Sequence, residues 1–123
     1  MKEFGWFARV VGQGHEAPYG FSVHTYGFDK TWKQPNVQIV YPMNPGQAMD
    51  ILYTIAQMVD KGEKLKPGRD YFDVILEGYN VRFAWAKESG RRLLRAILPD
   101  EEGRVARGEI TGKFARQWEG TEE

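Results

Sequence analysis

One amphipathic helix dominates the pattern of this sequence and limits what the chain can fold into. Between positions 45 and 61, apolar residues recur at the spacing that places side chains on one face of an α-helix. Asn44 suits the N-cap, Pro45 suits the first helical position, and Gly62 suits a left-handed C-terminal cap. Because such a helix buries one face, it predicts a second layer that covers this face. The expected core-facing residues are Ala48, Ile51, Leu52, Ile55 and Val59.

Short strand-like segments lie on both sides of this helix in the sequence. They are rich in β-branched and aromatic residues, and positions 19–26 show the alternation that is typical of a half-buried strand. A polar loop is expected at positions 27–35, and a short helical or turn segment at positions 87–92. The sequence therefore predicts an α+β fold, with a mainly antiparallel sheet of about five to six strands, one main helix and short C-terminal helical segments. The expected strands cover positions 4–11, 19–26, 36–41, 71–76, 80–85 and 93–98, with 71–76 and 80–85 paired as a hairpin.

The chain has the length and the continuity of a single domain. It contains 123 residues, and no repeat or low-complexity linker divides it. After a turn at positions 99–103, positions 104–123 are expected to form a flexible or docked tail. Ile110, Phe114 and Trp118 recur at four-residue spacing in this tail, which favours a short docked helix.

The composition excludes several classes of site. Cysteine is absent, so disulfides, thiolate zinc sites and cysteine nucleophiles are excluded. Only two histidines are present, His15 and His24, so we expect no metal site and no cofactor. The sequence has no apolar run long enough to cross a bilayer and no signal-peptide pattern. We therefore expect a cytoplasmic protein that does not bind membranes.

The charge is balanced overall but uneven along the chain. The sequence contains 17 basic and 17 acidic residues, which argues against binding to long nucleic acid. Positions 82–118 nevertheless carry nine basic residues against five acidic ones, and seven of the nine are arginine. Arginine suits carboxylate and phosphate groups because its planar fork donates two parallel hydrogen bonds. A solvated basic face is the simpler interpretation of this segment, and an anion site is the alternative.

Several short motifs, in order along nearly the whole chain, are similar to those of a known family. The motifs are Gly5-Trp6, Phe21-Ser22-Val23-His24-Thr25, Pro35-Asn36, Val59-Asp60-Lys61-Gly62-Glu63 with Pro67-Gly68, Glu77-Gly78-Tyr79-Asn80-Val81-Arg82-Phe83 and Pro99-Asp100-Glu101-Glu102-Gly103-Arg104. Their order and spacing resemble family 4262 of the domains of unknown function, found in bacteria and phages. The chain departs from that family at His24, where the family has a small glycine, and at Asn36, where it has an acidic residue. The resemblance implies no established reaction.

Aromatic residues and arginines are the side chains that remain for a ligand site. An aromatic face stacks on a nucleobase, and a guanidinium binds phosphate. Arg82 alternates with Val81 and Phe83, so it is expected to face away from the core. The candidate ligand-binding residues are Ser22, His24, Tyr26, Trp32, Arg82, Trp85, Arg91 and Arg92.

Three functions are consistent with these residues. The leading hypothesis is a non-enzymatic binding module for a small anionic, nucleotide-like ligand, which in a phage could sequester a defence signal nucleotide. The first alternative is a protein-interaction domain, an inhibitor or immunity partner, with an exposed Trp32 loop in its contact surface. The second is a small hydrolase that uses His24 with Ser22 and a carboxylate such as Asp100, although the acidic turn at positions 100–102 is expected to be solvated. A homodimer is also expected, because small domains often build sites between subunits.

Overall fold

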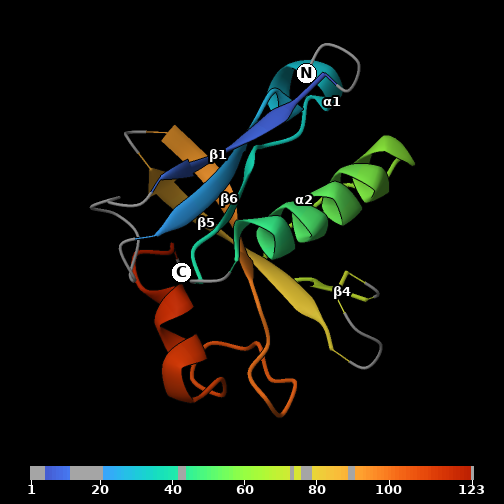
Figure 1. Ribbon diagram of the computed structural model, residues 1–123. Helices are drawn as coiled ribbons and strands as arrows, with labels where there is room; N and C mark the ends of the chain where they lie inside the picture. The colour runs from blue at the N-terminus through green and yellow to red at the C-terminus, as the bar shows by residue number, and fades with distance from the viewer. Residues whose placement is uncertain are drawn as a thin grey trace.

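Among the residues that the computed structural model describes, six strands form one sheet in the order β1-β2-β3-β6-β5-β4 (Figure 1). Strands β3 and β6 run parallel, and the other neighbouring strands run antiparallel. The α+β prediction is therefore confirmed. The described residues are 5–11, 21–41, 44–72, 74–75, 79–88 and 91–122. The strands are β1 (Phe7–Val11), β2 (Ser22–Tyr26), β3 (Val37–Ile39), β4 (Asp70–Tyr71), β5 (Val81–Glu88) and β6 (Arg91–Ile97), and the helices are α1 (Phe28–Trp32), α2 (Pro45–Asp60) and the 3-10 helix η1 (Gly112–Trp118).

Helix α2 has the ends that the sequence predicts. The Asn44 side chain accepts a hydrogen bond of 2.7 Å from the Gly46 N–H, and a proline stands at the first turn. At the other end, Gly62 adopts a φ of 104°, and its N–H donates to the Val59 carbonyl. The helix therefore stops where a left-handed residue turns the chain. Its fully or almost fully buried face contains Ala48, Leu52, Ile55, Ala56 and Val59, and Ile51 is half-buried.

Helix α2 crosses one face of the sheet and forms the main core with it (Figure 1). Alternate residues of the central strands point toward this helix because successive side chains of a strand face opposite sides. Burial of a large apolar side chain contributes about 1.5–3 kcal/mol, so this layer supplies most of the hydrophobic stabilisation. The residues at its centre with no exposed surface include Val23, Val37, Ile39, Leu52, Ile55, Phe83 and Leu94.

The opposite face of the sheet is covered by the C-terminal segment. Ile110 and the half-buried Phe114 and Trp118 pack against Ala84 and Ile97. Both aromatic residues belong to η1. Ala84 lies directly opposite Arg95 in the β5–β6 register, which places this second cluster on the face turned away from α2. The segment that begins at position 104 therefore docks through the four-residue spacing noted in the sequence. Within the described ranges, no helix combines the length and the apolarity needed to cross a membrane.

The prediction of a half-buried second strand is wrong. Ser22 has 0% of its surface exposed, Thr25 1% and His24 7%, so both faces of β2 are buried. The polar face of β2 continues into β3, where the Gln38 amide donates to the Ser22 hydroxyl. Alternation alone cannot distinguish a buried polar layer from a solvated one, because both have polar residues at every second position.

Three further predictions on local structure need correction. Positions 27–35 contain helix α1 instead of a continuous loop. Positions 87–88 end β5 and positions 91–92 begin β6, with Lys87 paired to Arg92, where a helical or turn segment was expected. Of the described positions in the strand expected at 71–76, Tyr71 alone lies in a strand; the observed strand, Asp70–Tyr71, pairs with β5 as predicted. Charged residues with low strand propensity extend β5 and β6 because each strand supplies the hydrogen-bonding partner of the other. Positions 4, 19–20, 73, 76–78 and 89–90, on which parts of these predictions fall, lie outside the described residues.

A buried arginine joins the sheet to the C-terminal segment. Arg95 on β6 has no exposed surface, and its guanidinium donates to the Gln38 side chain at 2.9 Å. It also donates to the backbone carbonyls of Gln117 and Glu119, at 2.6 Å and 2.5 Å. A buried charge is tolerated when its donors are satisfied in this way. Arg95 thus connects β6, β3 and the end of η1.

We predict that Arg95→Leu lowers the free energy of unfolding by at least about 2 kcal/mol, because several buried acceptors lose their donor. The measurement is chemical denaturation of the wild type and the variant. Lys113→Ala, which removes an exposed cation from η1, is the control and changes the free energy of unfolding by less than about 0.5 kcal/mol. Equal stability of Arg95→Leu and the wild type would contradict the structural role of this guanidinium.

Candidate functional site

The structure divides the candidate residues between two clefts and two packed positions. The first, which we call the Arg91 cleft, has a volume of about 390 Å³, and His24, Tyr26, Arg91 and Arg92 are among its lining residues. The second, which we call the Trp118 cleft, has a volume of about 510 Å³. The candidates that line the second cleft are Arg82, Trp85 and again Arg92.

An aromatic stack and an arginine form the centre of the Arg91 cleft. The Tyr26 hydroxyl and the His24 Nε2 are 2.7 Å apart and share a hydrogen bond. The Tyr26 ring stacks on Phe7, with ring centroids 5.0 Å apart. The Arg91 guanidinium carbon lies 5.5 Å from the centroid of the Tyr26 ring, within the range of a cation–π interaction. The cross-strand pairing of Phe7 with Tyr26 explains the stack, because paired residues project from the same face of a sheet.

A second hollow of about 410 Å³ adjoins the Arg91 cleft. Tyr26, Asp29, Asn36 and Arg91 line both hollows, and Lys30 lines the second one. The two hollows therefore lie next to each other, and we call them together the Arg91 groove. The four shared residues come from β2, from α1, from the residue before β3 and from β6.

Two backbone segments that line the Arg91 groove approach each other closely. Gly27 precedes α1 with a φ of 101°, a conformation that L side chains rarely adopt. A Cβ atom at this position would lie 2.5 Å from the Gly5 carbonyl oxygen. Only glycine therefore allows the segment before β1 to lie against the start of α1, where both segments line the groove.

The arginines of the two clefts differ in their hydrogen-bond and ion-pair partners. The exposed Arg91 guanidinium makes no hydrogen bond or ion pair with any residue that the structure describes. In the Trp118 cleft, Arg82 pairs with Asp70 at 2.7 Å and Arg92 pairs with Glu122 at 3.0 Å. Arg91 is therefore the arginine whose full hydrogen-bonding capacity remains available to a ligand.

The Trp118 cleft holds the chain's own C-terminal residues. The Arg92 guanidinium lies 3.9 Å from the centroid of the Trp85 ring and donates two hydrogen bonds to the Glu122 carboxylate. The Glu122 N–H donates to the Trp85 carbonyl at 2.8 Å. Arg107, 4.8 Å from the centroid of the Trp118 ring, donates to the Thr121 hydroxyl. These arginine–tryptophan pairs fasten the C-terminal segment to β5, which is a structural role.

Two of the predicted site residues lie outside both clefts. Ser22 is fully buried and accepts a hydrogen bond from the Gln38 side chain, so a substrate has no access to its hydroxyl. Trp32 is half-buried in α1, and its Nε1 donates to Asp60 at 3.3 Å. The prediction that Trp32 stands in an exposed loop is therefore wrong, because the ring packs against the core that α2 forms.

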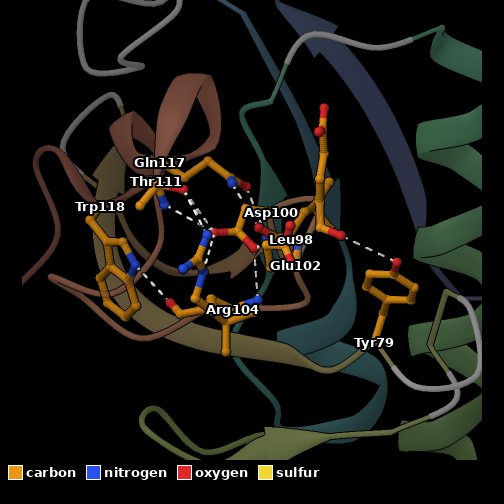
Figure 2. Close-up of polar contacts among 10 residues, drawn as sticks. Tyr79, Leu98, Asp100, Glu102, Arg104, Thr111, Gln117 and Trp118 are labelled. Carbon is orange, nitrogen blue, oxygen red and sulfur yellow. Dashed lines mark hydrogen bonds and ion pairs between the residues drawn. The ribbon is translucent and has the colours of Figure 1, made fainter.

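Asp100 is committed to the loop that follows β6 (Figure 2). Its carboxylate accepts hydrogen bonds from the backbone N–H groups of Glu102, Arg104 and Thr111. It also accepts from the Arg104 Nε at 3.0 Å. Only 4% of the residue is exposed, so the prediction that the acidic turn is solvated is wrong for Asp100. This carboxylate organises the loop that leads into η1 and does not face His24 as a triad partner would.

The same contacts determine the protonation of Asp100. Burial by itself raises the pKa of this carboxyl. The hydrogen bonds from the Arg104 and Thr111 backbone, from the Arg104 side chain and from the Glu102 backbone outweigh burial and lower the pKa to about 2. Asp100 is thus ionised at neutral pH, and its charge stabilises the folded loop.

No three histidine, cysteine, aspartate or glutamate side chains lie close enough to hold a metal ion in the part of the chain that the structure describes. His15 lies outside that part. Comparisons with protein-family models, with curated proteins and with solved structures gave no match. The resemblance to family 4262 of the domains of unknown function stays a prediction.

The sequence analysis did not select four residues that line the Arg91 groove. Phe7, Asp29, Lys30 and Asn36 come from three separate segments, and no motif connects them. Asp29 and Lys30 lie in a segment that the sequence predicts to be a loop. Their position in the first turn of a helix was therefore not expected. Phe7 could have been found by pairing β1 with β2 as neighbouring antiparallel strands, because Phe7 is the cross-strand partner of Tyr26.

The pKa of Asp100 leads to a pH-dependent prediction. Because its folded-state pKa of about 2 lies below the ordinary aspartate value of 3.8, ionised Asp100 contributes stability above about pH 4. This contribution is lost as the pH falls from about 4 to about 2. We expect Asp100→Asn to be less stable than the wild type at pH 6, and this difference to shrink as the pH approaches 2.

Urea denaturation at a series of pH values measures this difference. Glu101→Gln is the control, because Glu101 is exposed in the same turn, and it has the stability of the wild type at each pH. A wild-type advantage over Asp100→Asn that stays constant from pH 6 to pH 2 would show that ionised Asp100 does not stabilise the loop.

Proposed function

We propose that this protein is a non-enzymatic binding module for a small anionic, nucleotide-like ligand, which it holds in the Arg91 groove. The observation that carries the proposal is the arrangement of Arg91 over the Tyr26 ring with no carboxylate partner among the described residues. A guanidinium in this position is free to bind phosphate through charge-assisted hydrogen bonds.

The size and lining of the groove support a ligand of this class. Its two hollows have volumes of about 390 Å³ and 410 Å³, each within the range of small-molecule sites. Phe7 and Tyr26 supply aromatic surface, and 40% of Phe7 is exposed. Exposed aromatic surface beside cationic groups suits the base and the phosphates of a nucleotide.

The aromatic part of the groove is held in position before any ligand binds. The hydrogen bond between His24 and Tyr26 fixes the phenol, and the stack with Phe7 fixes the ring plane. Because His24 is almost fully buried, this support is rigid. Preorganisation of this kind reduces the entropy that a ligand loses on binding.

The positions of the proposed nucleophile, Ser22, and of the proposed carboxylate, Asp100, favour ligand binding over the hydrolase alternative. Ser22 is fully buried, and the Asp100 carboxylate accepts hydrogen bonds from the backbone of its own loop. The interaction alternative loses its proposed anchor, because Trp32 packs against the core. Sequestration of a signal nucleotide in a phage and formation of a homodimer stay hypotheses.

We predict that the purified protein shows a thermal shift with at least one nucleotide, and that Arg91→Ala weakens this binding by about 10-fold or more. Differential scanning fluorimetry over a panel of mono-, di-, tri- and cyclic nucleotides measures the shift. Chromatography of the ligand after incubation is expected to return it chemically unchanged. Lys87→Ala, a change of an exposed cation in the same hairpin outside the groove lining, is the control and retains binding. A flat response across the whole panel would rule out the proposal.

A further inference from the structure

The four residues shared by both hollows of the Arg91 groove place four different kinds of group together. Tyr26 presents an aromatic ring, Asp29 a carboxylate, Asn36 a carboxamide and Arg91 a guanidinium. Backbone contacts keep the residues close, because the Phe28 N–H, one residue before Asp29, donates to the Asn36 side chain at 3.1 Å. The junction thus offers a stacking surface, an acceptor, a donor and a cation.

The orientation of the Asn36 carboxamide is fixed by its neighbours. Its Oδ1 accepts from the Phe28 N–H and from the Thr25 hydroxyl at 3.0 Å. The Thr25 hydroxyl oxygen in turn accepts from the Val37 N–H at 2.9 Å, so it must direct its own hydrogen toward Asn36. A backbone N–H only donates, hence the atom that faces it must be the amide oxygen. The Asn36 Nδ2, which makes no hydrogen bond to the described residues, is left as a donor in a known orientation.

The Asp29 carboxylate is the complementary group. Asp29 is exposed at the start of α1, and its Oδ1 accepts from the Lys30 N–H at 3.0 Å. An ionised carboxylate only accepts hydrogen bonds, and its two oxygens suit a pair of adjacent donors. Asp29 therefore favours a ligand edge with two neighbouring N–H groups.

From this set of groups we infer that the Arg91 groove selects guanine nucleotides, an inference that rests on the proposed function. The guanine edge presents an acceptor, O6, beside the adjacent donors N1–H and N2–H. The carboxylate of Asp29 accepts from N1–H and N2–H, and the Nδ2 of Asn36 donates to O6. The base lies against the Phe7–Tyr26 stack, and Arg91 and Lys30 bind the phosphates. An adenine edge carries an acceptor, N1, where guanine has a donor, so its lone pair would face the carboxylate.

Isothermal titration with GDP, ADP and xanthosine diphosphate tests this inference on the whole chain. The wild type is expected to bind GDP at least 10-fold more tightly than ADP. Asp29→Asn is expected to lose this preference and to bind xanthosine diphosphate better than GDP. The reason is that the xanthine ring has a carbonyl in place of the N2 amino group, and this carbonyl accepts from the new amide.

Asn36→Asp tests the donor separately from the fold. The new carboxylate can still accept from Thr25 and from the Phe28 N–H, but it has no N–H to offer to O6. We expect a wild-type melting curve by circular dichroism and at least 10-fold weaker binding of GDP. Asp50→Asn, a change of an exposed acid on α2, is the control and binds GDP as the wild type does.

The outcomes separate this inference from the proposed function. Equal binding of GDP and ADP, tighter binding of ADP, or an unchanged GDP preference in Asp29→Asn would overturn guanine selection. In each of these cases the proposal of a nucleotide-binding groove would survive. Absence of binding for all three diphosphates, together with a flat response to the nucleotide panel, would overturn both.

Discussion

The buried guanidinium of Arg95 connects parts of this protein that lie far apart in the sequence. It extends from β6 to the Gln38 side chain on β3 and to two carbonyl groups at the end of η1. Removing an arginine from water costs several kcal/mol, and this cost is offset only when its donors find acceptors. The C-terminal segment supplies those acceptors, so the buried charge and the docking of that segment require each other. Gln117 strengthens the junction, because its side chain binds both the N–H and the carbonyl of Leu98.

The remaining arginines divide according to the partners that the tertiary structure provides. Arg82, Arg92 and Arg104 each bind a carboxylate, and Arg107 binds a hydroxyl beside a tryptophan ring. These four side chains hold edges and loops in place. Arg91 differs because its position at the start of β6 directs it to an aromatic ring. The arginines of positions 82–118 are therefore mostly structural, and Arg91 is the arginine of this segment with no hydrogen bond or ion pair to the described residues.

The fold was easier to predict than the site, for physical reasons. The ends of α2 depend on contacts within a few residues, namely the Asn44 cap and the left-handed Gly62, so local patterns identify them. The lengths of β4, β5 and β6 depend on cross-strand partners that are distant in the sequence, and these lengths were wrong or approximate. The expected site contained Arg91 and the Tyr26 ring, which line the same groove, and it also contained Arg82 and Arg92, which pair with carboxylates. It lacked Asp29 and Asn36, whose approach depends on a hydrogen bond between α1 and the residue before β3.

By itself the sequence determined one capped helix, a set of short strands, the absence of thiol chemistry and a surplus of arginine in the last third of the chain. Those properties follow from residue type and from spacing over a few positions. Only the tertiary structure decided which acidic and basic side chains neutralise each other and which stay available. The same residue type is fully buried at Arg95 and forms an ion pair with a carboxylate at Arg92. At Arg91 it lies over an aromatic ring without an ion pair to the described residues. Burial and the distance to acceptors make this difference, and both arise only when distant segments pack together.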